Sequence, residues 1–326
     1  MTSRRKPRRA REIERPREPT LAARVRELTG LSWNRARDLC RSGRVRVNGE
    51  ITRDPALRIP EGATVEANES APRERRGVLP DARILFADRS VAVVFKEAGE
   101  LTVPYDDERD TLVDKLRAAL RRRGKGFDPQ LGIVHRLDKG TSGILVFARN
   151  LAAKRHLAGL FRSHDIERRY EALAHGHAAL TSHESYLIAN RGDGLRGSWG
   201  VFRKPLGKRP KDARWSRTHV LKAEPLRGAS RLTLKLETGR QHQIRIHLAE
   251  AGHPLVGEHV YIRDHERAGR RTIDAPRPML HARSLGFVHP DRDEMMRFEA
   301  PPPADFQQLL KQLRSRTDPQ RDPPRT

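Results

Sequence analysis

The chain has 326 residues, and at about 150 residues per domain this length suggests roughly two domains. The 66 Lys and Arg residues exceed the 42 Asp and Glu residues, so the formal net charge is +24, and nucleic acid is the commonest partner of such a surface. Hydrophobic residues make up 36% of the chain, which excludes a wholly disordered protein. The sequence has no apolar run near the roughly 20 residues of a membrane span and no apolar signal-peptide segment, and its single cysteine excludes an intramolecular disulfide. We therefore expect a cytoplasmic, monomeric enzyme or binding protein that does not contact a membrane.

Three segments are predicted to lack regular structure. Residues 1–19 carry eight basic and three acidic residues with three prolines, which predicts a disordered basic arm. Residues 313–326 have a similar composition and predict a disordered tail. Residues 68–80 combine proline and arginine with few apolar residues, so we interpret them as the linker between a domain at 20–67 and a domain at 81–312.

Residues 20–67 have the pattern of a small domain with two helices and a hairpin. Thr20 is a capping residue before a first helix that Gly30 ends. Ser32 is placed to cap a second helix that Gly43 ends, and the spacing of its apolar residues predicts an inner face. That face consists of Trp33, Ala36, Leu39 and Cys40. Three arginines fall outside it, namely Arg35, Arg37 and Arg41.

A short strand and a tight turn follow the second helix. Val45 and Val47 alternate with Arg44 and Arg46, and Asn48-Gly49 is a strong hairpin signal because both residues tolerate positive φ. The stretch 32–49 resembles the S4 RNA-binding domain. A small basic domain with no defined partner is the alternative. The resemblance implies that the helix and hairpin contact structured RNA through Arg35, Arg37, Arg41, Arg44 and Arg46.

The second domain starts near Asp81 and is expected to have an α+β fold. Its first elements are two strands, 83–86 and 91–95, and then a helix that Thr111 and Asp114 begin with a capping-box pair. Strands alternate irregularly with helices up to about residue 312, and no repeated strand-helix-strand unit is present. The pattern therefore predicts a mixed, mostly antiparallel sheet.

The most distinctive stretch of the second domain is 131–148, where an apolar strand leads into a charged turn and a second apolar strand returns. The turn presents His135, Arg136 and Asp138 at the end of a strand, which is a typical position for catalytic groups. Positive neighbours on both sides of Asp138 favour its ionised form, as a nucleophile or base requires. A tight turn in which Asp138 only caps its own backbone is the alternative.

A second candidate stretch, 232–248, is predicted to form a strand, a Thr-Gly turn and a helix that runs to about Ala251. Ile244 and Leu248 mark the expected buried side of this helix, and Gln241 and Arg245 are four residues apart on one face. The helix start favours anions.

Three further residues of these segments have structural alternatives. His242 and His247 are five residues apart, so they are poor joint metal ligands, and a structural role is expected for each alone. Tyr170 lies in a predicted strand at 167–174, where a core position is the more common role.

Together these segments resemble the RluA-type pseudouridine synthases. The family pattern His-Arg-Leu-Asp-x-x-Thr-Ser-Gly is met by 135–143, the Tyr-x-Ala-Leu strand by 170–173, and Thr-Gly-Arg-x-His-Gln-Ile-Arg-x-His by 238–247. The resemblance covers roughly residues 83–312. Two departures concern loops, because Lys96-Glu97 stands in place of Lys-Pro and Gly257-Glu258 in place of Gly-Asp.

The resemblance implies roles for individual residues. Asp138 matches the catalytic aspartate, Tyr170 the tyrosine that stacks on the target base, and Arg245 the arginine that pairs with the aspartate. Arg136 matches the arginine that fills the space left by the flipped base. The residues expected to bind substrate are His135, Arg136, Arg240, His242 and Gln243.

The implied reaction isomerises uridine to pseudouridine in RNA, and it requires no cofactor and no metal. The sequence does not decide whether Asp138 attacks C1′ or removes a sugar proton. Ribosomal RNA is the favoured partner, and transfer RNA remains open. Two other functions are considered, namely a non-catalytic RNA-binding factor associated with the ribosome and a metal-dependent nuclease that uses His135, Asp138 and His242.

Overall fold

The computed structural model describes residues 18–71, 77–104, 110–123, 131–202 and 208–314. These residues divide between two compact units whose boundary lies between Arg76 and Gly77. That boundary falls within the stretch interpreted as a linker, and Leu79 is already buried in the core of the second unit. The predicted basic arm and tail lie largely outside the described residues, but the tail prediction is wrong at its first two residues, because Leu313 and Arg314 belong to the last helix and Leu313 is buried.

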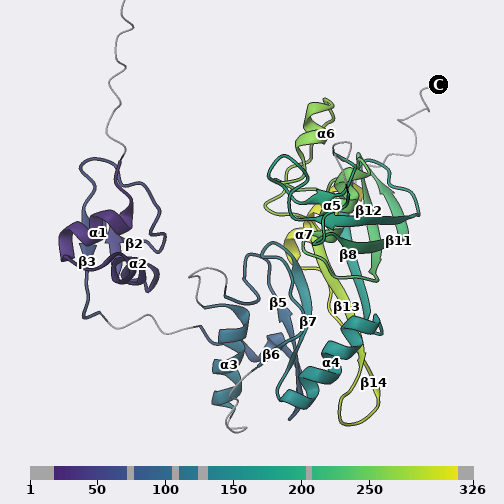
Figure 1. Cartoon of the computed structure of the whole chain (residues 1–326), viewed down its shortest axis with the longest axis horizontal. Helices are drawn as coiled ribbons and strands as arrows, with labels where there is room; N and C mark the ends of the chain where they lie inside the picture. Colours follow the sequence, from purple (N-terminus) through teal and green to yellow (C-terminus); the bar gives the residue numbers. More distant parts are fainter. Residues whose placement is uncertain (1–17, 72–76, 105–109, 124–130, 203–207, 315–326) are drawn as a thin grey trace, which may run out of the picture. The chain divides into compact units, whose positions relative to one another are not determined.

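The first unit contains two helices and a three-stranded antiparallel sheet with the order β2-β1-β3 (Figure 1). Its elements are α1 (Leu21–Thr29), α2 (Trp33–Arg41), β1 (Val45–Val47), β2 (Glu50–Ile51) and β3 (Val65–Ala67). The Thr20 hydroxyl accepts a hydrogen bond from the Ala23 N–H, and Gly30 ends α1 at a φ of 68°. Asn48 and Gly49 join β1 to β2 with positive φ at both residues, so the predicted hairpin is confirmed.

Two details of α2 differ from the prediction. Ser32 makes no side-chain capping bond. Trp33 is 46% exposed, whereas Ala36, Leu39 and Cys40 form the buried face as expected. Trp33 opens the helix, so its ring extends past the core, and the Arg26 guanidinium lies 5.4 Å from the ring centroid.

The second unit is built on an 11-stranded sheet with the main order β10-β9-β11-β12-β8-β13-β7-β5-β4. Strands β14 and β6 pair with β13 and β7 outside that path. Among the described strand pairs, β13 and β7 are parallel and the others antiparallel, which confirms the mixed, mostly antiparallel sheet of an α+β fold.

The elements of the second unit, in chain order, are a 3-10 turn (Asp81–Arg83), β4 (Ile84–Ala87), β5 (Val91–Lys96), α3 (Leu112–Arg122), β6 (Gly132–Ile133), β7 (Ser142–Ala148), α4 (Leu151–Ser163), β8 (Glu167–His175), β9 (Ser182–Ile188), β10 (Gly197–Ser198), β11 (Arg214–Leu226), β12 (Ala229–Leu236), α5 (Gln243–Glu250), α6 (Arg263–Arg267), β13 (Leu280–Val288), β14 (Met295–Glu299) and α7 (Ala304–Arg314).

Helices cover both faces of the central strands. Side chains alternate along β5 and β7, so Val94 and Leu145 pack with α3, whereas Val93 and Ile144 pack with α4. Figure 1 shows α3 and α4 on opposite sides of these strands. Because β7 is buried on both faces, the loop that enters it is held on a rigid support.

Gly143 in β7 is a position where no other residue fits. Its φ is 129°, and an added Cβ would lie 2.3 Å from the backbone oxygen of Ala282 in the neighbouring strand. We expect Gly143→Ala to lower the free energy of unfolding by about 3 kcal/mol, because backbone strain and overpacking act together. Gly159→Ala in α4 is the matched control, since its Cβ meets nothing within 4 Å. Urea unfolding followed by circular dichroism measures both, and equal stability of the two variants would contradict the assignment.

Candidate active site

The loop between β6 and β7 carries Asp138 and is tied to the β5 side of the sheet. The Leu137 N–H donates to the Thr102 hydroxyl at 3.2 Å, and that hydroxyl donates to the Leu137 carbonyl at 3.0 Å. The Gly99 N–H donates to the Lys139 carbonyl at 2.8 Å. The backbone on both sides of Asp138 is therefore fixed by its neighbours.

Lys96 is a second anchor of this loop, and in the sequence only its place in a family motif marks it. Its Nζ donates to the backbone carbonyls of Glu97 at 2.8 Å, Lys139 at 3.1 Å and Thr141 at 2.7 Å, and the side chain has no exposed surface. Burial lowers the pKa of Lys96 to about 7, whereas three carbonyl acceptors favour the ammonium with its three N–H donors. Lys96 thus holds the backbone that follows Asp138, and Thr102 holds the residue before it.

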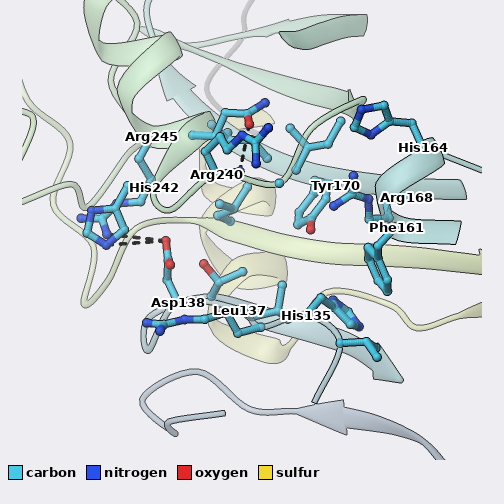
Figure 2. A pocket seen from close by; sticks show the side chains of 18 of the residues that line it. His135, Leu137, Asp138, Phe161, His164, Arg168, Tyr170, Arg240, His242 and Arg245 are labelled. Carbon is cyan, nitrogen blue, oxygen red and sulfur yellow. Dashed lines mark hydrogen bonds and ion pairs between the residues drawn. The ribbon is translucent and has the colours of Figure 1, made fainter. Parts of the chain in front are cut away.

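One cavity of about 510 Å³ collects the residues that the resemblance assigned to catalysis and substrate binding (Figure 2). The Asp138 loop, the end of α4, strand β8 and the turn into α5 supply its walls. All eight predicted residues line it, namely His135, Arg136, Asp138, Tyr170, Arg240, His242, Gln243 and Arg245. Three motifs that are far apart in the sequence therefore meet in one place.

The Asp138 carboxylate faces two cationic or ionisable groups without a hydrogen bond to either. Its Oδ2 lies 3.8 Å from an Arg245 nitrogen and 3.9 Å from the His242 Nε2, and the side chain is 21% exposed. No hydrogen bond of this carboxylate is present in the described part of the chain. Its oxygens are therefore available to a substrate.

The hydrogen bonds of Arg245 go to Glu258. Nε and one terminal nitrogen of Arg245 donate to the two Glu258 oxygens at 2.8 and 2.7 Å, and the Glu258 side chain is fully buried. Burial opposes the charge of Arg245, but the bonds and charge of Glu258 outweigh it and raise the pKa of Arg245. Asp138 and Arg245 are thus neighbours, as expected, and Glu258 fixes the Arg245 guanidinium beside Asp138.

Glu258 also orders the segment that follows it. Its Oε1 accepts from the N–H groups of His259 at 3.1 Å and Val260 at 2.9 Å. Burial favours the neutral acid, but the bonds and charge of Arg245 prevail and lower the pKa of Glu258. The Gly257-Glu258 departure from the family pattern marked this position in the sequence, although nothing there indicated its partner.

His242 connects this network to Tyr261. The Tyr261 hydroxyl and the His242 Nδ1 are 2.8 Å apart, and the Arg245 guanidinium lies 5.3 Å from the centroid of the Tyr261 ring. Burial lowers the pKa of His242, the charge of Arg245 adds to that effect, and Asp138 opposes it. The imidazole is therefore neutral at pH 7, with Nε2 toward the carboxylate.

The start of α5 differs from the prediction. His242 has a φ of 58° and precedes the helix, which begins at Gln243, so Gln241 does not share a helical face with Arg245. The helix is buried from Gln243 to Leu248 and not along one stripe, because its buried polar residues have partners: Gln243 and His247 bond to Thr218 of β11, and Arg245 pairs with Glu258. His247, for example, contacts the hydroxyl of Thr218 at 2.9 Å, so its structural role is confirmed.

Tyr170 reaches the cavity from the middle of β8. It lies opposite Leu234 of β12 and Ala282 of β13, and it is 7% exposed. Burial raises the pKa of Tyr170, so the phenol is neutral at pH 7. The ring is thereby fixed in orientation by a strand on each side.

The other cavity residues are fixed to different degrees. Gln243 uses its amide for four hydrogen bonds within the protein, and the His135 Nε2 accepts the N–H of Val146 at 3.1 Å. Burial lowers the pKa of His135 to about 3, so it stays neutral. Arg136 and Arg240 are exposed at the cavity, and Arg240 donates to a backbone carbonyl at 3.2 Å.

The five arginines predicted to contact RNA all lie in the first unit, namely Arg35, Arg37, Arg41, Arg44 and Arg46. Arg35 and Arg37 are exposed on α2, and neither forms an ion pair within residues 18–71. Arg44 and Arg46 each donate to a backbone carbonyl of the same unit. Arg41 is half-buried.

The described residues contain neither a metal-binding cluster nor a membrane-spanning helix. Within them, no three His, Cys, Asp or Glu side chains are grouped so that they could hold a metal ion, so the three residues of the nuclease alternative form no such site. No helix in the described ranges is long and apolar enough to cross a membrane.

Comparisons with known proteins agree with this geometry. The sequence model of the RNA pseudouridylate synthase family matches residues 90–250, and that of the S4 domain matches residues 25–65. Ribosomal large subunit pseudouridine synthase D of Zymomonas mobilis is 36% identical over 294 residues, which are 88% of this chain and 90% of the relative. An uncharacterised RNA pseudouridine synthase of Mycobacterium bovis is 34% identical over 295 residues, 88% of this chain and 92% of the relative.

A solved structure is similar in fold to this chain. Human RNA Pseudouridylate Synthase Domain Containing 4 superposes with a TM-score of 0.54 at 21% identity, covering 71% of this chain and 93% of that chain. Both resemblances noted in the sequence are confirmed. The chain belongs to the family of RNA pseudouridine synthases, isomerases that act on RNA, and carries an S4 domain near its N-terminus.

Proposed function

We propose that the substrate of this chain is a uridine in the ribosomal RNA of the large subunit, and that Asp138, Tyr170 and Arg245 carry out the isomerisation. The observation that carries the assignment of these residues is their convergence, from three separate motifs, on one cavity. The name of the Zymomonas mobilis relative supports the large-subunit RNA as the substrate, and the S4 domain supports binding to structured RNA. On this proposal the enzyme acts in the cytoplasm.

The reaction needs a cavity of this kind because the base must leave its stack. The bond from C1′ to N1 breaks, the uracil rotates, and a bond from C1′ to C5 forms. Flipping the nucleotide out of a helix costs roughly a few kcal/mol. Stacking of the uracil on the Tyr170 ring would recover about 1–3 kcal/mol of that cost.

The surroundings of Asp138 suit a carboxylate that acts on the sugar. Attack on C1′ and removal of a sugar proton both require the ionised form, and Arg245 at 3.8 Å favours it. Arg245 is itself held by Glu258, so the charge stays in place while the base rotates. Preorganised charge of this kind acts on the chemical step rather than on RNA affinity.

The S4 domain provides a second, independent prediction. We expect the double variant Arg35→Ala, Arg37→Ala to weaken binding to a large-subunit RNA fragment by about 10-fold. The slope of log affinity against log salt concentration should become shallower by the equivalent of about two phosphate contacts. The rate at saturating enzyme stays at the parent value, because these residues contact no reacting atom. Arg24→Ala is the matched control, since Arg24 of α1 is paired with Glu27 at 2.7 Å. Unchanged affinity and salt dependence of the double variant would contradict the RNA-binding role of α2.

Mapping of pseudouridine tests the choice of RNA. Purified protein is incubated with transcripts of large-subunit RNA, small-subunit RNA and transfer RNA, and modified positions are identified in each. We expect conversion at one or a few uridines of the large-subunit RNA. Conversion confined to transfer RNA would overturn the proposed substrate, and binding without conversion of any RNA would favour the non-catalytic alternative.

A further inference from the structure

Arg168 is a cavity residue to which no role has yet been assigned. It precedes Tyr170 by two residues on β8, so both side chains project to the same face of the strand and line the cavity. Figure 2 shows Arg168 with Phe161 and His164 beside Tyr170, on the side away from Asp138. The cavity thus has a carboxylate at one end and a guanidinium at the other.

The guanidinium of Arg168 is buried without an acidic partner. Arg168 is 7% exposed, which equals the exposure of Arg245 and is close to that of Arg277 at 8%. Arg245 pairs with Glu258 and Arg277 with Asp305, each at 2.7 Å. Arg168 forms no ion pair with any carboxylate of the described residues.

The hydrogen bonds of Arg168 also leave donors unused. One terminal nitrogen donates to the Glu237 carbonyl at 3.1 Å, and the buried Nε has no partner in the described part of the chain. Burial lowers the pKa of Arg168. A buried charge with no counterion costs several kcal/mol of stability. Such a group in a cavity is therefore a candidate for contact with a ligand that carries or develops the opposite charge.

The walls hold the guanidinium in this position. Its central carbon lies 5.4 Å from the centroid of the Phe161 ring. A Cβ on Gly239 would approach a terminal nitrogen of Arg168 to 2.7 Å, so glycine at this turn leaves room for the side chain. The site is therefore built around the cation.

We propose that Arg168 binds a carbonyl oxygen of the flipped uracil and stabilises the negative charge that develops on the ring when the C1′–N1 bond breaks. The proposal rests on the function proposed above. With C1′ at Asp138 and the ring on Tyr170, the far edge of the base extends toward Arg168. The phosphates stay with the sugar, at the other end of the cavity.

The electron balance of the step is simple. The C1′–N1 bonding pair passes to N1 and spreads over O2 and O4, where a guanidinium donor stabilises it. C1′ in turn either bonds to the Asp138 carboxylate or, after Asp138 removes a sugar proton, forms a double bond to C2′, and the attack of C5 reverses this change. When C5 bonds to C1′, the charge on the ring is neutralised, C5 then loses its proton, and N1 gains one. Arg168 stays protonated throughout and exchanges no proton.

Sulfur substitution of the substrate tests the contact atom by atom. RNA with uridine, 2-thiouridine or 4-thiouridine at the target position carries tritium at C5, and its release is followed at saturating full-length enzyme. We expect Arg168→Met to lower the rate with uridine by about 10²-fold, with RNA affinity within a few-fold. Replacing the contacted uracil oxygen by sulfur slows the parent enzyme. The same replacement slows Arg168→Met no further, because this variant has already lost the hydrogen bond from the guanidinium.

Arg169→Met is the matched control, because this neighbour in β8 is exposed and projects to the opposite face. We expect it to retain the parent rate and the full response to sulfur. Arg168→Lys keeps the positive charge but not the planar guanidinium, so we expect an intermediate rate. It replaces Arg168→Met in the comparison if circular dichroism shows that Arg168→Met is poorly folded.

Three results would overturn the proposal. The first is that neither 2-thiouridine nor 4-thiouridine slows the parent enzyme, and the second is that sulfur slows the parent and Arg168→Met equally. The third is that Arg168→Met loses only RNA affinity and its salt dependence, which would identify Arg168 as a phosphate contact. A parent enzyme that releases no tritium from unmodified uridine would instead refute the proposed reaction or RNA.

Discussion

Asp138→Asn is expected to lower the rate of pseudouridine formation by about 10⁴-fold or more, as removal of a central catalytic group does in other enzymes. The amide has the shape of the carboxylate but no charge, so it neither attacks C1′ nor accepts a sugar proton. Affinity for RNA stays within a few-fold, because phosphate contacts supply most of it. Single-turnover measurements at saturating enzyme separate the two quantities.

The stability of Asp138→Asn should equal that of the parent. The Asp138 carboxylate makes no side-chain hydrogen bond within the described residues, so the amide breaks none. Asp165→Asn is a control with an exposed carboxylate outside the cavity, and it should retain the parent rate. Substantial turnover by Asp138→Asn would refute the catalytic role of Asp138.

Features encoded by adjacent residues were predictable from the sequence. The Asn48-Gly49 turn was identified because each residue tolerates positive φ, and both have it. Asp114 accepts the backbone N–H of Thr111, and the Thr111 side chain accepts the backbone N–H of Asp114, as the predicted capping box requires. The mostly antiparallel sheet followed from the absence of repeated strand-helix-strand units. The turn and the capping box each lie within a few residues, and the sheet type follows from the order of elements, so no tertiary contact is needed to interpret them.

Contacts between distant residues were not predictable from local patterns. The Lys96 ammonium reaches the Thr141 carbonyl, 45 residues away, through a strand order that hydrophobic periodicity does not reveal. The Arg245–Glu258 pair depends on a loop that returns to α5. Helix α5 is buried around most of its surface, and polar partners satisfy its buried residues, so its apolar spacing indicated one side only. The spacing of Trp33 matched that of the buried residues of α2, but Trp33 is the first residue of this helix and its ring lies outside the core.

Arg168 illustrates the same limit at the site itself. In the sequence it is one of several arginines in a strongly basic chain, and two basic residues stand side by side at 168 and 169. Only the fold places one of them in the cavity and the other in solvent. The missing carboxylate partner, which distinguishes Arg168 from Arg245, is a property of the packed structure.

Arg245→Met is expected to lower the saturated rate by about 10²–10³-fold and RNA affinity by much less, since Arg245 lies inside the cavity beside Asp138. The variant also leaves Glu258 buried without its partner, which costs about 3–5 kcal/mol of stability. A rate measured on this variant alone would therefore mix lost chemistry with lost folding.

The double variant Arg245→Met, Glu258→Gln separates the two effects. It removes both charges of the buried pair, and the amide oxygen at position 258 still accepts the N–H groups of His259 and Val260. We therefore expect its unfolding temperature to lie nearer to that of the parent than that of Arg245→Met does. Its saturated rate should remain as low as that of Arg245→Met, because Asp138 has lost its cation in both.

Glu258→Asp completes the series, because it keeps the charge and shortens the side chain by one methylene. We expect a rate between those of the parent and Arg245→Met, since the bidentate contact that orients the guanidinium is disturbed and its charge remains. The S4-domain variant at Arg35 and Arg37 should show the opposite pattern, with lower affinity and the parent rate at saturation. If the double variant at positions 245 and 258 reacts at the parent rate once saturated, and only its affinity for RNA falls, then Arg245 is a phosphate contact and does not assist Asp138.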